Sequence, residues 1–204
     1  MGQSLRCHSF LFLMAVNILA FGDSLTEGLC NKYSWEMKPY TNRLQTLLGE
    51  EFEVHNAGVS GEETSSMLTR LPKLLKNNQY KFVFILGGTN DMSTLKAETI
   101  SQNLIKLHRY ALTAGCISFA LSIPEMKFGS SLFKNEKRIT INRALEDFAE
   151  QNENCFFVPW ADAIPNNYAR GDSHPMWSDN IHLSQEGYEK MGTVIFDLCH
   201  QKLQ

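Results

Sequence analysis

The stretch Val16-Asn17-Ile18-Leu19-Ala20-Phe21-Gly22-Asp23-Ser24-Leu25 joins an apolar run to a glycine and two polar residues. A short apolar run that ends at a turn residue is typical of a buried strand. Gly22 permits a tight turn, and Ser24 would then lie at the mouth of the next helix, where free backbone N–H groups converge. The stretch therefore predicts a strand that leads directly into a helix.

The same kind of apolar run occurs four more times along the chain. These runs are Phe52–His55, Lys81–Leu86, Cys116–Ile123 and Cys155–Val158. Other segments repeat their apolar residues with the period of an amphipathic helix. These segments are Tyr40–Leu48, Ala97–Ala114, Ile141–Phe148 and a last helix that Ser184 can cap.

Five strands that alternate with helices predict right-handed crossovers and a parallel sheet covered on both faces. The predicted fold class is α/β, a three-layer α/β/α sandwich with a five-stranded parallel sheet. Ligands of such sheets bind beyond the carboxyl ends of the strands. Function is therefore expected in the residues that directly follow each apolar run.

The composition favours one globular domain. The chain has 204 residues and a formal net charge of −3, from 19 Lys and Arg against 22 Asp and Glu. This near-balance gives no large basic field, which argues against nucleic acid or an anionic membrane as the main partner. No internal repeat or linker marks a domain boundary. One domain with one core is therefore expected.

The N-terminal residues are interpreted separately, with residues 1–13 as a leader of unknown role and residues 14–204 as the single domain. The apolar run from Phe10 to Phe21 is shorter than the roughly 20 residues of a membrane helix, and it carries no A-x-A cleavage site. We therefore expect no stable membrane insertion. Five cysteines without a CxxC pair fit reduced thiols, and a cytoplasmic location is predicted.

Two further strand ends carry glycines. Gly58 follows the second apolar run, and a glycine there lets the backbone approach a ligand and present its N–H. The third run ends in Leu86-Gly87-Gly88-Thr89-Asn90-Asp91, which turns the chain at the sheet edge and lets the Asn90 carboxamide offer an N–H donor to the same crevice. Each motif alone also fits ordinary turn chemistry. Neither GxxxxGK[ST] nor GxGxxG is present.

The segment Ser178-Asp179-Asn180-Ile181-His182 precedes the last predicted helix. Positions three apart in a turn or short helix lie on one side, so Asp179 can hold one ring nitrogen of His182 and leave the other free. A general base needs this arrangement, because the carboxylate fixes the tautomer and stabilises the imidazolium.

Together the four motifs supply every part of an acyl-transfer site. Ser24 is the expected nucleophile, His182 the base and Asp179 its orienting carboxylate. The Gly58 N–H, the Asn90 side chain and the Ser24 N–H are the expected oxyanion donors, with Asp23 and Gly88 in supporting positions. No cluster has metal-ligand spacing, so neither a metal nor a cofactor is predicted.

These blocks resemble those of the SGNH hydrolases, also called the GDSL esterase/lipase family. The resemblance covers Ile18 to the final helix. Through Val59-Ser60-Gly61-Glu62-Glu63-Thr64-Ser65 and Arg70-Leu71-Pro72 the chain is also similar to the branch with bacterial thioesterase/lysophospholipases. The resemblance implies a flavodoxin-like strand order and a shallow site without a large lid. It also implies family roles for Ser24, Gly58, Asn90 and His182, with Asp179 completing the triad.

The sequence thus predicts a serine esterase that hydrolyses carboxylic esters of small or medium acyl chains, with a small-molecule ester and water as its partners. An acyltransferase or a carbohydrate deacetylase would use the same site, and a non-catalytic ligand-binding module would keep the fold. The choice among oxygen ester, thioester, lysophospholipid and acetylated sugar stays open, as does the oligomeric state.

Overall fold

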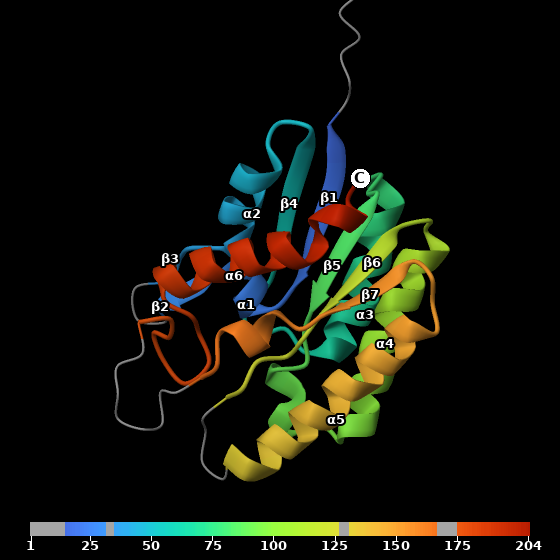
Figure 1. Ribbon diagram of the computed structural model, residues 1–204. Helices are drawn as coiled ribbons and strands as arrows, with labels where there is room; N and C mark the ends of the chain where they lie inside the picture. Colours follow the sequence, from blue (N-terminus) through green and yellow to red (C-terminus); the bar gives the residue numbers. More distant parts are fainter. Residues whose placement is uncertain (1–14, 32–34, 127–130, 167–174) are drawn as a thin grey trace, which may run out of the picture.

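A five-stranded parallel sheet forms the centre of the molecule (Figure 1). Its strands are β1 (Val16–Gly22), β4 (Phe52–Gly58), β5 (Phe82–Leu86), β6 (Ile117–Leu121) and β7 (Cys155–Val158). They lie in the order β4-β1-β5-β6-β7, and every neighbouring pair is parallel. Counted along the chain, this is the 2-1-3-4-5 order of a flavodoxin-like sheet. The predicted fold class is confirmed.

The structure is a computed structural model that describes residues 15–31, 35–126, 131–166 and 175–204, with residues 131–134 as backbone only. The predicted leader, residues 1–13, lies outside the described residues. Within the described ranges, no helix has both the length and the apolar content needed to cross a membrane. The four described cysteines are buried and free, and they are Cys30, Cys116, Cys155 and Cys199.

Helices cover both faces of the sheet (Figure 1). On one face lie α2 (Tyr40–Leu48) and α6 (Gln185–Cys199), which pack against each other. On the other face lie α3 (Thr64–Asn77), α4 (Ala97–Thr113) and α5 (Ser131–Glu150). The predicted helices in residues 40–48, 97–114 and 141–148 and after Ser184 are confirmed. The third of them extends over the whole of α5.

Alternate residues of β1 enter opposite cores. Ile18 belongs to the same core cluster as Leu44 of α2, and its neighbour Leu19 to the cluster with Met67 of α3. All four side chains have no exposed surface. Because successive side chains of a strand point to opposite faces and helices cover both, the strand has a continuous apolar sequence.

Several short elements complete the fold at the carboxyl edge of the sheet and at the end of the chain. They are α1 (Ser24–Glu27), a hairpin of β2 (Leu29–Asn31) and β3 (Glu36–Met37), and the single turns η1 (Asn90–Ser93), η2 (Trp160–Ala163) and η4 (His200–Lys202). The hairpin and α3 were not among the predicted elements.

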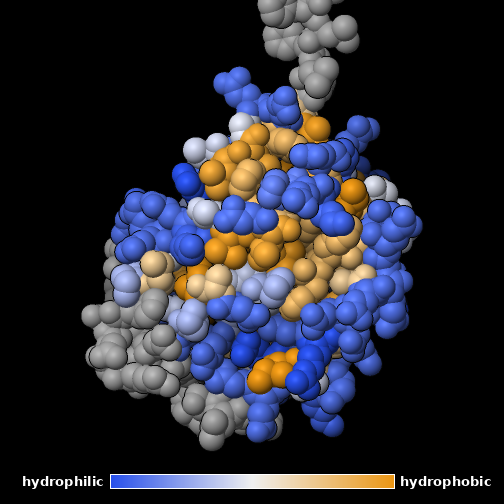
Figure 2. All heavy atoms as spheres, viewed as in Figure 1, coloured by the Kyte–Doolittle hydropathy of each residue, from blue (hydrophilic) through white to orange (hydrophobic). Residues whose placement is uncertain are grey.

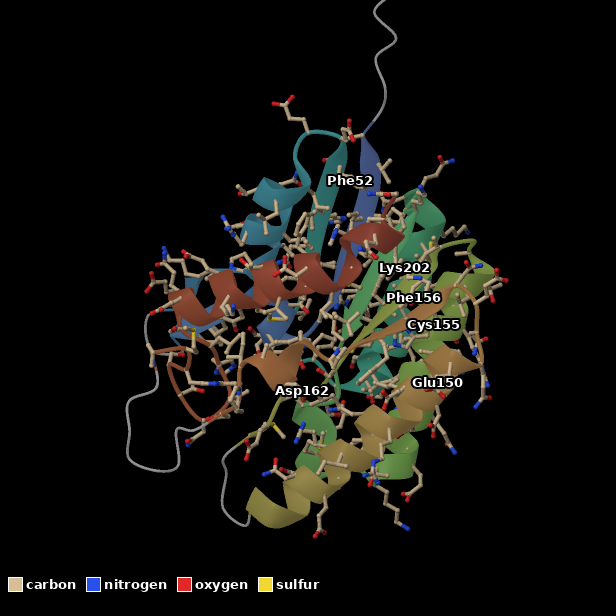
Figure 3. All side chains as sticks on the ribbon, in the orientation of Figure 1. Phe52, Glu150, Cys155, Phe156, Asp162 and Lys202 are labelled. Atoms are coloured by element: carbon tan, nitrogen blue, oxygen red, sulfur yellow. The ribbon has the colours of Figure 1, made fainter. Side chains whose placement is uncertain are left out.

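The face that carries α6 exposes hydrophobic as well as hydrophilic residues (Figure 2). Phe52 at the start of β4 and Phe156 in β7 are partly buried and pack against the core of this face. The Lys202 ammonium lies 4.8 Å from the ring centroid of Phe156 (Figure 3). Lys202 therefore shields an aromatic ring in an edge strand of the sheet.

Candidate active site

Ser24 lies where β1 passes into α1, as the sequence predicts. Asp23 is the N-cap of α1, and its Oδ1 accepts a hydrogen bond from Leu25 N–H at 3.0 Å. A Cβ at Gly22 would overlap the carbonyl oxygen of Leu86 in β5, so the strand end requires glycine. These constraints hold the Ser24 side chain, which is 6% exposed, at the carboxyl edge of the sheet.

The three residues of the predicted triad are in hydrogen-bond contact. Ser24 Oγ lies 3.0 Å from His182 Nε2, although 158 positions separate the two residues in the chain. His182 Nδ1 lies 2.9 Å from Asp179 Oδ2. The imidazole thus bridges the hydroxyl and the carboxylate, in the order that a serine nucleophile requires.

A tight turn before α6 orients Asp179. Its Oδ1 accepts hydrogen bonds from the backbone N–H groups of Ile181 and His182, both at 2.7 Å. Burial alone raises the pKa of Asp179, but the hydrogen bonds from the His182 side chain and from these two N–H groups outweigh it and lower the pKa to about 2. The carboxylate is therefore ionised at neutral pH and keeps a proton on His182 Nδ1.

A cavity of about 270 Å³ opens over the triad. Its polar lining consists of Ser24, Ser60, Gly61, Asn90 and His182. Its apolar lining consists of Leu29, Trp35 and Ile181. Trp35 is 66% exposed and has a φ of 52°, an uncommon backbone conformation for a bulky residue. The lining of the cavity therefore combines apolar side chains with Ser24 and His182.

Asn90 reaches this cavity from the end of β5. It is the first residue of η1, and its Nδ2 donates a hydrogen bond to the Glu62 carbonyl at 3.0 Å. A carboxamide nitrogen has two hydrogens, so a second donor remains. Gly88 has a φ of +96°, and a Cβ there would press on Ile100 in α4. Gly88 thus lets the chain pass over α4 and bring Asn90 to the site.

Gly58 lies in a different environment from the one its expected role requires. Its N–H already donates to Asn56 Oδ1 at 2.9 Å, and Gly58 does not line the cavity. A Cβ at this position would overlap the backbone of Glu27, so the glycine allows the end of β4 to pack closely against α1. This geometry argues against Gly58 as an oxyanion donor and corrects the prediction.

Gly61, three residues further on, lines the cavity instead. Its φ of +77° is in the left-handed region, which favours glycine. Among the described residues, neither the Gly61 N–H nor the Ser24 N–H has a hydrogen-bond partner. The prediction missed Gly61 because two glycines follow the same strand, and only the path of the loop shows which one lies beside Ser24.

A known protein family matches most of this chain. The model of the GDSL-like Lipase/Acylhydrolase family matches residues 20–190, which is most of the chain. The chain belongs to this family. The resemblance inferred from the four motifs is thereby confirmed at the level of the family.

Similar proteins have been named in bacteria. Esterase TesA of Pseudomonas aeruginosa is 30% identical over 115 residues, which are 53% of this chain and 55% of TesA. The uncharacterized lipoprotein YqeF of Bacillus subtilis is 31% identical over 85 residues, which are 39% of this chain and 33% of YqeF. The aligned parts thus span about half and about a third of these two relatives.

A solved structure supports the fold of this GDSL family member. The family 3 carbohydrate esterase of Clostridium thermocellum superposes with a TM-score of 0.72 at 19% identity, and the alignment covers 93% of this chain and 98% of that one. At that identity, the likeness concerns the fold alone.

Asp23 of the GDSL motif is completely buried and does not line the cavity. Burial raises its pKa to about 7, while the Leu25 N–H and the charge of His182 act in the opposite direction. Its Oδ2 has no hydrogen-bond partner among the described residues. Asp23 therefore acts as the cap of the helix that begins with Ser24.

Among the cavities of this family member that are larger than 270 Å³, two have a clear place in the fold. One of about 440 Å³ lies between the start of α4 and α5, and one of about 530 Å³ runs along β7 beside Glu150, Cys155 and Phe156 (Figure 3). Neither is lined by Ser24 or His182. Within the described part of the chain, no group of three or more His, Cys, Asp or Glu could hold a metal ion.

Proposed function

We propose that the protein is a serine hydrolase that cleaves carboxylic esters of small or medium acyl chains through an acyl-enzyme on Ser24. One observation carries the proposal: the contacts from Ser24 Oγ to His182 Nε2 at 3.0 Å and from His182 Nδ1 to Asp179 Oδ2 at 2.9 Å lie beside one cavity. A module that only binds ligands needs no base beside its serine.

In the first step, Ser24 Oγ attacks the carbonyl carbon of the ester and transfers its proton to His182 Nε2. Asp179, with a pKa of about 2, remains ionised and stabilises the imidazolium that forms. The developing oxyanion accepts hydrogen bonds from the Gly61 N–H, the Ser24 N–H and the second N–H of Asn90. Loss of one such donor typically lowers turnover by about 100- to 1000-fold.

In the second step, the tetrahedral intermediate collapses and the bond to the leaving alcohol breaks. His182 Nε2 donates its proton to that alcohol, and an ester of Ser24 remains. Water then attacks this acyl-enzyme, with His182 again as base, and releases the carboxylic acid and free Ser24. The same residues therefore serve both halves of the reaction, which are the formation of the acyl-enzyme and its hydrolysis.

The size of the cavity supports a small or medium acyl group. At about 270 Å³ it is slightly smaller than the roughly 300–1000 Å³ of typical small-molecule sites. Leu29, Trp35 and Ile181 supply the apolar surface that an acyl chain requires. A short or medium chain fits these dimensions, and a long chain would extend into solvent.

The test measures hydrolysis of p-nitrophenyl acetate, butyrate and octanoate from the first milliseconds. We expect a burst of p-nitrophenol in the wild type, no turnover in Ser24→Ala, and full activity in Ser66→Ala, which changes an exposed serine of α3. Undiminished turnover in Ser24→Ala contradicts the proposal, and so does the absence of activity in the wild type with every ester.

Deacetylation of a carbohydrate by the same site is the second candidate. The exposed ring of Trp35 at the cavity favours it, because a flat aromatic face can pack against a sugar ring. Acetate release from an acetylated xylose oligomer tests it. If p-nitrophenyl acetate is hydrolysed far more efficiently and Trp35→Ala leaves KM for the oligomer unchanged, the sugar is not the substrate.

A further inference from the structure

The segment Ser60-Gly61-Glu62, which we call the oxyanion loop, is held at one end by the Glu27 carboxylate and at the other by the Arg70 guanidinium. Gly61 at its centre lines the cavity and has a φ of +77°. A glycine in this conformation has little rigidity of its own. The position of its N–H relative to Ser24 therefore depends on what holds the two flanking residues.

Glu62 is fixed by Arg70 of α3. Arg70 Nε donates to Glu62 Oε1 at 2.8 Å, and Arg70 Nη2 donates to Glu62 Oε2. The side chain of Glu62 is only 7% exposed and that of Arg70 24% exposed. A bidentate arginine–carboxylate pair fixes orientation as well as distance, especially where water is excluded.

The remaining contacts of Arg70 tie the same guanidinium to the sheet. Nη1 donates to the Ala57 carbonyl at 2.8 Å, and Nη2 donates to the Gly22 carbonyl at 3.1 Å. The guanidinium also lies 4.1 Å from the centroid of the Phe21 ring. Arg70 thus connects the oxyanion loop to the ends of β1 and β4. Gly22, at the end of β1, directly precedes Asp23 and Ser24.

Glu62 also connects two of the three proposed oxyanion donors, the Gly61 N–H and the Asn90 carboxamide. Its own N–H follows Gly61 in the chain and donates to the Val59 carbonyl at 3.2 Å. Its carbonyl oxygen accepts the hydrogen bond from Asn90 Nδ2 at 3.0 Å. A shift of Glu62 would therefore displace both the Gly61 N–H and the Asn90 carboxamide.

Glu27 holds the other end of the loop. Its carboxylate oxygen Oε2 accepts a hydrogen bond from the Ser60 N–H at 2.8 Å and another from the Ser60 hydroxyl. Glu27 is the last residue of α1, the helix that begins with Ser24. This contact therefore sets the loop relative to the nucleophile.

We propose that Glu27, Glu62 and Arg70 are positioning residues that hold the Gly61 N–H and the Asn90 carboxamide as oxyanion donors for Ser24, an inference that rests on the proposed function. None of the three contacts the reacting atoms. Each acts through the oxyanion loop, and Arg70 is central because all its hydrogen bonds go to Glu62 or to the adjacent strand ends.

The test begins with Arg70→Met, Arg70→Lys and Glu62→Gln, measured with p-nitrophenyl butyrate. We expect kcat of Arg70→Met to fall about 100-fold, since a displacement of about 1 Å in a site can cost that much. KM should stay within about two-fold, because the oxyanion exists only in the transition state. Arg70→Lys keeps the charge but not the bidentate geometry and should recover only part of the loss.

Arg109→Met on α4 and Glu150→Gln at the end of α5 are matched controls, since they make the same chemical changes away from the triad. Both should retain the kcat of the wild type. If Arg70→Met and Arg70→Lys lower the melting temperature but keep the same kcat as the controls, Arg70 only stabilises the fold and the inference is overturned.

A double-mutant cycle with Asn90→Ala separates positioning from stability. If Arg70 acts through the oxyanion donors, Arg70→Met should cost less than about 10-fold in kcat in the Asn90→Ala background, whereas its effect on the melting temperature should be additive. Full additivity in kcat overturns the inference. Failure of the proposed function looks different, because the wild type itself would then show no turnover that depends on Ser24.

Discussion

Two serine–histidine pairs in this molecule have similar contacts but different surroundings. Ser24 Oγ and His182 Nε2 lie 3.0 Å apart beside a cavity at the carboxyl edge of the sheet. Ser118 Oγ in β6 and His108 Nδ1 in α4 lie 2.7 Å apart, and His108 is 1% exposed. The first pair faces a space that a substrate can enter, and the second holds a helix to a strand.

The two histidines also differ in their charged partners. His182 has the Asp179 carboxylate on its second ring nitrogen. Among the hydrogen bonds of the described residues, His108 has none to a carboxylate, and burial lowers its pKa to about 3. A hydrogen-bonded serine and histidine therefore do not by themselves make a nucleophile, because the histidine also needs an ionised partner and the serine must be accessible.

The largest expected effect comes from removing each histidine in turn. His182→Ala should lower kcat for p-nitrophenyl butyrate by about 10⁶-fold, the scale seen when the histidine of a serine protease triad is removed. His108→Gln should leave kcat per folded molecule unchanged. Comparable losses of kcat in both variants at equal folded fractions would erase the distinction between the two pairs.

The two serine–histidine pairs also differ in the carboxylate partner of the histidine. Asp179→Asn tests the importance of that carboxylate. A neutral amide no longer fixes the tautomer of His182, so kcat should fall about 10⁴-fold, as in the corresponding change in a serine protease. Asp147→Asn, at an exposed position of α5, is the control and should behave as the wild type. A loss below ten-fold in Asp179→Asn would mean that the carboxylate does not orient the base.

The buried pair of Ser118 and His108 should affect the stability of the fold rather than the catalytic activity. Ser118→Ala leaves His108 Nδ1 without a partner in the core, and we expect the free energy of unfolding to fall by about 1–3 kcal/mol. Urea unfolding at pH 7 measures this loss, with Ser66→Ala as the exposed control. The rate constants of Ser118→Ala should equal those of the wild type. A loss of kcat without a loss of stability would assign the pair to catalysis.

The last expected effect is a difference in the pH dependence of stability. The pKa of His108 is about 3 in the folded protein and about 6.5 in the unfolded chain, so the unfolded state binds more protons between these values. The neutral, buried side chain of His108 therefore makes its full contribution to stability above pH 6.5. This contribution is lost as the pH falls toward 3.

Urea unfolding at pH 7 and pH 4.5 checks this sign. The wild type should lose more stability between these two pH values than His108→Gln, which has no group to protonate there. The low pKa of Asp179, about 2, acts mainly below this window and is common to both proteins. Equal losses in the two proteins would show that His108 does not titrate on unfolding.

Most of the fold could be predicted because the buried strands have unmistakable sequences. β1 and β5 are covered on both faces and consist of continuous apolar runs. Among the strands, the predicted end differs most in β4, which extends three residues beyond His55. β4 is an edge strand with exposed side chains such as Glu53, so its composition is less apolar.

The elements that were not predicted have weak local signals. The strands of the β2–β3 hairpin have only three and two residues, too few to show an alternating pattern. In α3, Pro72 interrupts an otherwise helical pattern, and proline normally marks the end of a helix. Burial of Met67 and Leu71 against the sheet compensates for this weak signal.

The sequence by itself determined the family, the order of layers and the candidate triad. Ser24 directly follows a buried strand, and Asp179 and His182 are three residues apart, so local spacing is enough to identify them. By contrast, the packing of the elements determines which glycine lines the cavity, Gly61 rather than Gly58. It also creates the contacts of Glu27, Glu62 and Arg70 around the oxyanion loop. The physical reason is that these contacts join β1, β4 and α3, and no local pattern encodes which backbone N–H remains free when those elements pack together.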